Sequence, residues 1–135
     1  MKSNRLVIII LASMLLLLTI GCGFNFSTAK VSDAYTARNL DSEFEKVQSY
    51  GQDEVFLCIV DLANAPDDTV VSAAWYAVDA EDVDPNFLID EASITGDASP
   101  IYFDLSNNGL WPIGTYRIDI SLNEEFVQSV TFQVQ

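Results

Sequence analysis

Short runs of alternating apolar and polar residues, separated by turn-forming residues, constrain the fold of this chain more than any other feature. The clearest run spans residues 116–122, and its apolar positions are Tyr116, Ile118, Ile120 and Leu122. A period of two indicates a β-strand with one face buried and the other in solvent. We therefore expect the core of this protein to be built from strands.

The same kind of run recurs along most of the chain. Further strands are predicted at residues 55–62, 69–78, 87–94, 101–105 and 126–134, with a short strand or irregular edge segment at 31–40. Residues 41–47 instead suggest a helical turn capped by Asp41 or Ser42. Because the strands are short, the turn signals are regular and no long helix is evident, the pattern predicts an all-β antiparallel sandwich of about seven strands.

The first residues of the chain have the anatomy of a secretory signal. Lys2 and Arg5 precede an uncharged apolar run from Leu6 to Ile20, which Gly21 closes. The run is shorter than the roughly twenty apolar residues that a membrane-spanning helix needs. We therefore expect residues 1–21 to be a signal peptide rather than a membrane span.

The end of this segment, Thr19-Ile20-Gly21-Cys22, resembles the lipobox of bacterial lipoproteins. In that family the cysteine is acylated and becomes the first mature residue, so the resemblance implies lipidation at Cys22 and anchoring by lipid outside the cytoplasm, in the cell envelope or at the cell surface. Thr19 departs from the family pattern, which usually has Leu, Val or Ile there. A plain secretory signal or an uncleaved anchor with an incidental cysteine is the alternative. With cleavage before Cys22, we expect residues 22–33 to form a tether and residues 34–135 to form the folded domain.

The part of the chain after the signal is strongly acidic. Removing Lys2 and Arg5 from the 6 basic residues leaves four, which with 20 acidic residues gives a net charge of 4 − 20 = −16. Such a charge repels phosphate groups and argues against nucleic acid as a partner. It also disfavours docking to anionic lipid by charge, so the lipid chains must hold the protein at the membrane.

The residue inventory argues against an enzyme. The chain has no histidine, which removes the usual general base and the usual zinc ligand. Its two cysteines are Cys22 and Cys58, and acylation of Cys22 leaves Cys58 without an intrachain partner. We expect Cys58 to be a buried thiol that behaves as a small apolar residue, and we expect no catalytic residues and no obligatory cofactor.

A second resemblance lies in the segment Leu110-Trp111-Pro112-Ile113-Gly114-Thr115-Tyr116. The spacing Leu-x-x-Gly-x-Tyr before an alternating strand resembles the tyrosine corner of immunoglobulin-like domains, in which the phenol bonds back to the backbone upstream. The resemblance implies structural roles for Gly114 and Tyr116 and a core position for Trp75 on the third strand of that fold. Ile118 stands where antibody-type domains have their second cysteine, so the inter-sheet disulfide is absent.

The acidic loop from Asp79 to Asn86 is the candidate metal site. Asp82-Val83-Asp84-Pro85-Asn86 opens like an EF-hand calcium loop, but Phe87 and Ser93 stand where that motif needs glycine and glutamate. A looser calcium site remains open, with the ligands Asp79, Glu81, Asp82 and Asp84. The alternative is a solvated loop that aids solubility.

Three aromatic residues form a possible binding surface. Tyr76 and Tyr102 fall on predicted outer faces and could share a patch. Trp111 either packs against the preceding loop or serves as a binding platform.

The leading hypothesis is a membrane-anchored lipoprotein that presents a non-catalytic immunoglobulin-like module to a protein of the envelope or surface. The alternative is a carbohydrate- or calcium-binding module that uses the acidic loop 79–86.

Overall fold

The computed structural model describes residues 28–135, and this part of the chain forms nine β-strands. They are β1 (Lys30–Leu40), β2 (Glu43–Lys46), β3 (Ser49–Tyr50), β4 (Phe56–Ala63), β5 (Val70–Ala80), β6 (Phe87–Thr95), β7 (Ile101–Leu105), β8 (Gly114–Leu122) and β9 (Glu125–Val134). These residues contain no helix long and apolar enough to cross a membrane. The predicted signal peptide and Cys22 lie outside the described residues.

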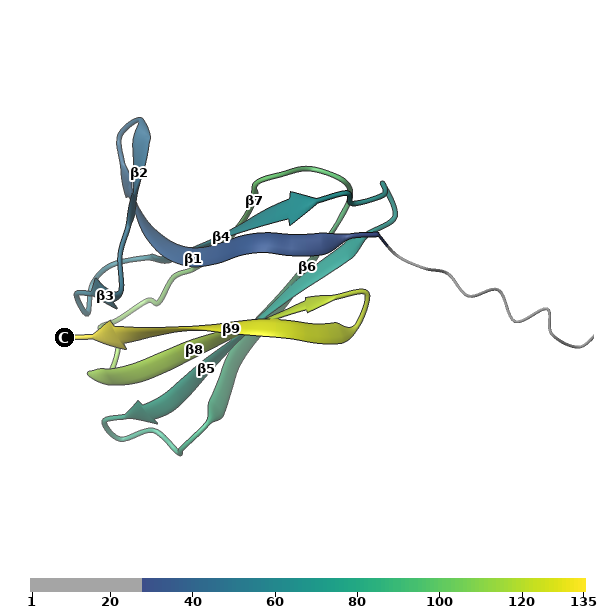
Figure 1. Ribbon diagram of the computed structural model, residues 1–135. Coiled ribbons are helices and arrows are strands. Elements are labelled where there is room, and N and C mark those ends of the chain that lie inside the picture. The colour runs from purple at the N-terminus through teal and green to yellow at the C-terminus, as the bar shows by residue number, and fades with distance from the viewer. Residues whose placement is uncertain (1–27) are drawn as a thin grey trace, which may run out of the picture.

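The strands form two sheets that pack face to face (Figure 1). The first sheet has the order β2-β1-β4-β7 and the second the order β3-β9-β8-β5-β6. Neighbouring strands are antiparallel except β3 and β9, which pair in parallel. With β1, β4 and β7 against β5, β8 and β9, the arrangement is that of the A, B and E strands against the C, F and G strands of an immunoglobulin-like sandwich. The predicted fold class is confirmed.

The alternation seen in the sequence corresponds to the inner faces of the two sheets. On β5 every second residue is buried, and the set is Val71, Ala73, Trp75 and Ala77. On β8 the buried set is Tyr116, Ile118, Ile120 and Leu122, as predicted. The register between these strands places Trp75 opposite Ile118, so both strands present the same face to the core.

An aromatic cluster surrounds Phe56 in the core between the two sheets. Phe56 is fully buried, and its ring lies 4.3 Å from that of Trp111 and 4.7 Å from that of Phe132, measured between centroids. The rings of Tyr50 and Tyr116 lie 5.0 and 5.5 Å from it. Such tilted and offset pairs add to the free energy gained from burial alone. A domain that has no disulfide among its described residues is held together in this way by packing.

Two expectations about the first strands are wrong. Residues 41–47 do not form a helical turn, because β2 pairs with the end of β1 in a hairpin that aligns Asn39 with Phe44. The polar-apolar alternation Glu43-Phe44-Glu45 has the period of a strand, and the free edge of β1 supplies its hydrogen-bond partners. The tether also ends earlier than predicted, since β1 begins at Lys30 and includes residues 30–33.

Candidate interaction surface

The β1–β2 hairpin, residues 38–46, curls over the outer face of the first sheet. The ring of Phe44 on β2 lies 5.3 Å from the ring of Tyr102 on β7, with the two planes inclined by 33°. β1 and β4 separate these strands in the sheet, and three strand spacings in a flat sheet amount to about 14 Å. The contact therefore requires the hairpin to leave the plane of the sheet, and Figure 1 shows β2 standing away from it.

A second, smaller apolar cluster lies outside the main core, on the outer face of the first sheet. Ala37 and Ile59 are 0% and 1% exposed, yet neither belongs to the core between the sheets. Ile59 lies on the outer face of β4, where the register places it between Tyr35 on β1 and Tyr102 on β7. We call Tyr35, Ala37, Phe44, Ile59 and Tyr102 the outer cluster.

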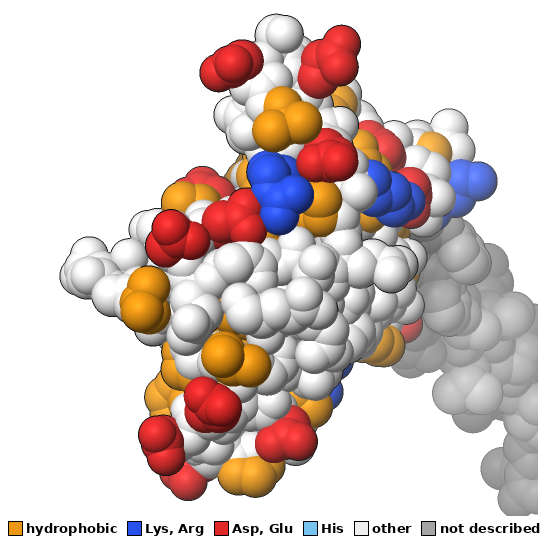
Figure 2. Space-filling view, turned by 90° about the vertical axis from the view of Figure 1, so that its left-hand side faces the viewer, with side chains coloured by type: hydrophobic (Ala, Val, Ile, Leu, Met, Phe, Trp, Pro, Cys, Tyr) orange, Lys and Arg blue, Asp and Glu red, His pale blue; other side chains and the backbone are white. Residues whose placement is uncertain are grey.

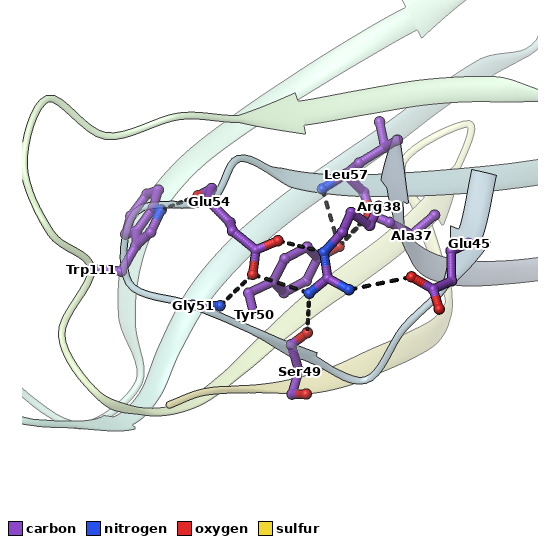
Figure 3. Close-up of polar contacts among 9 residues, drawn as sticks. All are labelled: Ala37, Arg38, Glu45, Ser49, Tyr50, Gly51, Glu54, Leu57 and Trp111. Carbon is purple, nitrogen blue, oxygen red and sulfur yellow. Dashed lines mark hydrogen bonds and ion pairs between the residues drawn. The ribbon is translucent and has the colours of Figure 1, made fainter. Parts of the chain in front are cut away.

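Arg38 fixes the base of the hairpin (Figure 3). Two of its nitrogens donate to the carboxylate of Glu54, one of them at 3.0 Å. The same guanidinium donates to Glu45 at 3.4 Å and to the carbonyl of Ser49 at 3.3 Å. Hydrogen bonding between the two side chains raises the pKa of Arg38 and lowers the pKa of Glu54, so both are charged at neutral pH.

Tyr50 completes this network from the core side. Its hydroxyl donates to the carbonyl of Ala37 at 2.7 Å and accepts the backbone N–H of Leu57 at 3.3 Å. Burial raises the pKa of Tyr50 to about 12, which keeps the phenol protonated and able to donate. The hydroxyl thus joins β1 to β4 at the point where the hairpin leaves the sheet (Figure 3).

A shallow pocket of about 530 Å³ opens beside the Arg38 network. Its lining residues are Arg38, Asn39, Glu54, Val55, Leu57 and Asp104. Asn39 pairs with Phe44 in the hairpin, and Asp104 lies two residues beyond Tyr102 on the same face of β7. The pocket therefore adjoins the Phe44–Tyr102 pair. Within residues 28–135, the side chains of Asn39 and Asp104 are exposed and make no hydrogen bond or ion pair.

Lys46 covers the ring of Tyr35 in the outer cluster. Its ammonium lies 4.5 Å from the ring centroid of Tyr35 and 3.3 Å from the carboxylate of Asp33. Burial, followed by the negative charges of Asp61 and Asp33, raises the pKa of Tyr35. A cation held between a ring and a carboxylate thus forms part of this face.

The end of the sandwich opposite Lys30 exposes apolar side chains among carboxylates. β1 begins at Lys30 and ends at Leu40, so Leu40 lies at the far end with the loops 51–55, 81–86 and 106–113. Two backbone hydrogen bonds join these loops, from Trp111 to Gln52 at 2.8 Å and from Glu81 to Ile113 at 3.0 Å. We call this end, which faces the viewer in Figure 2, the distal end.

The distal end combines two kinds of side chain. Leu110 is 64% exposed, Val55 53% and Leu40 50%. The carboxylates of this end include Asp41, Glu43, Asp53, Glu81, Asp82 and Asp84, and all of them are exposed. Figure 2 shows the apolar side chains as separate patches, with carboxylates between them and few cations. The distal end thus places exposed apolar side chains in a negatively charged surrounding.

The acidic loop does not bring its carboxylates together. Asp79, Glu81, Asp82 and Asp84 are all exposed. In the described part of the chain, no group of three or more Asp, Glu, Cys or His side chains could hold a metal ion. Calcium binding by the loop stays open as the alternative to a solvated loop.

The expected patch of Tyr76 and Tyr102 does not exist. Tyr76 lies on β5 in the second sheet and Tyr102 on β7 in the first, and each points away from the core. The two rings therefore lie on opposite faces of the sandwich. Arg117 covers Tyr76 at 4.8 Å from its ring centroid, whereas Tyr102 is 45% exposed and has Phe44 as its neighbour.

Trp111 is not a binding platform, because its side chain is 5% exposed. The indole stacks on Phe56 with the planes inclined by 21°, and its Nε1 donates to the carbonyl of Glu54 at 2.9 Å. A buried indole with its N–H satisfied contributes to the core rather than to recognition. The packing alternative for this residue is thus the right one.

The three residues with expected structural roles lie in and beside the core. Trp75 is 2% exposed. The hydroxyl of Tyr116 donates to the carbonyl of Pro112, four residues upstream, at 2.7 Å. Gly114 has a φ of 155°, and a Cβ placed on it would lie 2.2 Å from the carbonyl oxygen of Asp79. Only glycine lets β5 and the start of β8 approach so closely.

Cys58 is buried on the inner face of β4, as expected. Burial raises the pKa of its thiol to about 12. The thiolate, which is the reactive form, is therefore scarce at neutral pH. Cys58 acts in this fold as a small apolar residue.

Three residues of this surface were not singled out from the sequence. Phe44 carried a usable signal, because it alternates with Glu43 and Glu45 in the manner of a strand. Arg38 and Glu54 carried none, since they are separated by 16 positions and meet only through the pairing of β1 with β4.

No family model matches the sequence, and a search of curated proteins finds no match. Among solved structures, an immunoglobulin-like protein from Pseudomonas aeruginosa is similar, with 11% sequence identity and a TM-score of 0.49. The similarity covers 79% of this chain and 96% of that protein. By the strand order of its own two sheets, the described domain is an immunoglobulin-like β-sandwich.

Proposed function

We propose that this protein is a bacterial lipoprotein, anchored through Cys22, that presents a non-catalytic immunoglobulin-like module of the tyrosine-corner type to a protein partner outside the cytoplasm. The observation that carries the proposal is that the two ends of the sandwich differ. The first strand begins at Lys30, eight residues after Cys22, at one end of the domain. The exposed apolar and acidic side chains of the distal end lie at the other.

This difference between the two ends suits a module tethered close to a membrane. A tether of eight residues spans at most about 28 Å, so the end of the domain at Lys30 would stay near the lipid surface. β1 has 11 residues, which corresponds to about 36 Å along the strand. The distal end would therefore face away from the membrane, where a partner can reach it.

Charge favours a partner with a basic surface. All 20 carboxylates of the protein follow Cys22, against four cations, and three of those four are engaged in ion pairs with carboxylates. The negative electrostatic field of the protein speeds the approach of a basic partner and repels acidic partners. The bond from Tyr116 to Pro112 supports the tyrosine-corner assignment.

Intact-mass analysis of the membrane fraction after bacterial expression tests the anchor. We expect a mature chain that begins at Cys22 and carries acyl mass. Cys22→Ser should lose that mass, whereas Cys58→Ser, which alters the other cysteine, should keep it. An unmodified wild-type chain in the soluble exported fraction would contradict the proposal. If the chain is acylated as expected, crosslinking in intact cells from a crosslinker placed at Leu110 would identify the partner.

A further inference from the structure

We propose that Tyr102, Asp104 and Phe44 form a recognition site for an arginine side chain of the partner. This inference rests on the proposed function in one respect, that the ligand belongs to a protein. The site lies on the outer face of the first sheet, beside the pocket at the base of the hairpin. Its components are the ring pair Phe44–Tyr102 and the unpaired carboxylate of Asp104.

The chain already holds its own cations in this manner. Three cations of the described domain each lie over an aromatic ring and form an ion pair with a carboxylate. These sets are Lys46 with Tyr35 and Asp33, Arg117 with Tyr76 and Asp119, and Arg38 with Tyr50 and Glu54. A ring face and a carboxylate attract a cation together, because the quadrupole of the ring and the negative charge act in the same direction.

Tyr102 and Asp104 form a fourth set of the same kind. Asp33 and Tyr35 are two positions apart on β1, and Tyr102 and Asp104 are two positions apart on β7. In both cases the side chains project from one face of a strand at a spacing of about 7 Å. Lys46 occupies the set of Asp33 and Tyr35, but no cation of residues 28–135 pairs with Asp104 or lies over Tyr102. The set of Tyr102 and Asp104 is therefore open to a cation from another molecule.

The hairpin adds a second ring and a polar rim to this set. Phe44 is 47% exposed and Tyr102 45%, so both rings present surface to solvent while they stay in contact with each other. The amide of Asn39 and the carboxylate of Asp104 line the adjoining pocket, which has a volume of about 530 Å³. A planar guanidinium can stack on a ring and bond a carboxylate through two nitrogens at once, which an ammonium cannot do. This geometry favours arginine over lysine.

The charges around the pocket also favour a cation. Arg38 lines the pocket, but Glu54 and Glu45 both pair with it, so with Asp104 three carboxylates face one guanidinium. A second copy of this chain or an acidic ligand would be repelled by the same field. A neutral sugar could also stack on the rings, and the experiment below separates it from a cation.

The test is a titration of the full chain, purified in non-ionic detergent, with a labelled peptide of alternating arginine and glycine. Fluorescence anisotropy measures the dissociation constant for wild type and variants. Asp104→Asn and Tyr102→Ala should each weaken binding by about threefold to tenfold, the range expected for one desolvated cation contact. Asp97→Asn, which removes one exposed carboxylate at the other end of the sandwich, should change it by less than about twofold. A lysine–glycine peptide should bind more weakly than the arginine peptide.

Besides a wild type that does not bind the peptide, two results would overturn the inference. Equal weakening by Asp104→Asn and Asp97→Asn would mean that only the overall field attracts the peptide. Binding of maltohexaose that Tyr102→Ala abolishes, with no peptide binding, would assign the site to carbohydrate. Phe44→Leu keeps apolar volume and removes the ring, so it should weaken peptide binding if the ring acts as a platform. Thermal melting of each variant verifies that it is folded.

The failure of this inference can be told apart from failure of the proposed function. Anchoring is read from the mass and fractionation of Cys22→Ser, and that variant still carries the complete sandwich. If it binds the arginine peptide but wild type is not acylated, the site stands and the anchor falls. If wild type is acylated and does not bind the peptide, the anchor stands and the site falls.

Discussion

Arg38 on β1 and Glu54 before β4 form a two-nitrogen ion pair that ties the β1–β2 hairpin to the body of the domain. Their side chains are 34% and 29% exposed, so solvent screens the pair only in part. Both side chains line the pocket at the base of the hairpin that carries Phe44. The pair therefore joins the strand that leads into the hairpin to the loop before β4.

Glu54→Gln should lower the free energy of unfolding by about 1 kcal/mol, after allowance for screening of this partly exposed pair. Glu45→Gln, which alters the weaker partner of Arg38, should change it by less than about 0.5 kcal/mol. Urea denaturation at pH 7 measures both. A larger effect at Glu45 than at Glu54 would show that Glu54 is not the principal partner.

The stability contributed by Glu54 should depend on pH in a defined direction. Its pKa is lowered from 4.5 in the folded state, mainly by hydrogen bonding from Arg38. A lowered pKa stabilises the fold fully above the unfolded value and loses that effect as the pH falls through the folded value. The difference in unfolding free energy between wild type and Glu54→Gln should therefore be constant above about pH 5.5 and shrink below pH 4.5. A difference that grows on acidification would contradict the assignment.

Gly114→Ala should destabilise the domain severely, by about 3 kcal/mol. The added methyl group would lie 2.2 Å from the carbonyl oxygen of Asp79 and 2.5 Å from the Cα of Ala80, and backbone cannot yield as a flexible side chain would. Gly109→Ala is the matched control, because a Cβ there meets nothing within 4 Å. Thermal melting should separate the two variants clearly, and similar melting temperatures would refute the predicted clash.

Tyr116→Phe should lower the free energy of unfolding by about 1 kcal/mol, since it removes one hydrogen bond and keeps the buried ring. The lost bond is the one to the Pro112 carbonyl, 2.7 Å long. Tyr102→Phe removes a hydroxyl that makes no hydrogen bond within residues 28–135 and should be close to neutral. Denaturant titration that ranks the two variants in the opposite order would argue against a structural role for the Tyr116 hydroxyl.

Cys58 should resist thiol reagents in the native state. Burial raises its pKa to about 12, and its side chain is fully shielded from solvent. In the Cys22→Ser variant at pH 8, a maleimide should label no thiol in buffer and one in denaturant, as mass spectrometry can show. Rapid labelling of the folded protein would mean that β4 opens far more readily than its packing suggests.

Calcium should leave the melting temperature unchanged at millimolar concentration. The carboxylates of the loop 79–86 are exposed and do not gather into a site. A ligand that binds only the folded state raises the melting temperature, so the measurement is sensitive to weak sites. A rise that Asp82→Asn abolishes would support calcium binding by the loop and contradict this prediction.

The inner faces of β5 and β8 could be predicted because alternation is a local property. Whether Trp75 or Tyr76 points inward depends only on which of them falls in phase with the other apolar residues of the same strand. The same holds for the hydrogen bond of Tyr116, whose partner Pro112 lies four residues away. These features need no knowledge of the neighbouring strands.

The surface could not be predicted in the same way, because it depends on which strands share a sheet. The sequence by itself determined the β class, the inner faces of β5 and β8, the acidic charge and the buried state of Cys58. Only the tertiary structure decided that Tyr76 and Tyr102 lie on opposite faces, that Trp111 is buried, and that the hairpin lays Phe44 on Tyr102. The physical reason is that strand pairing joins residues far apart in the chain, and such pairing leaves no periodic trace in the sequence.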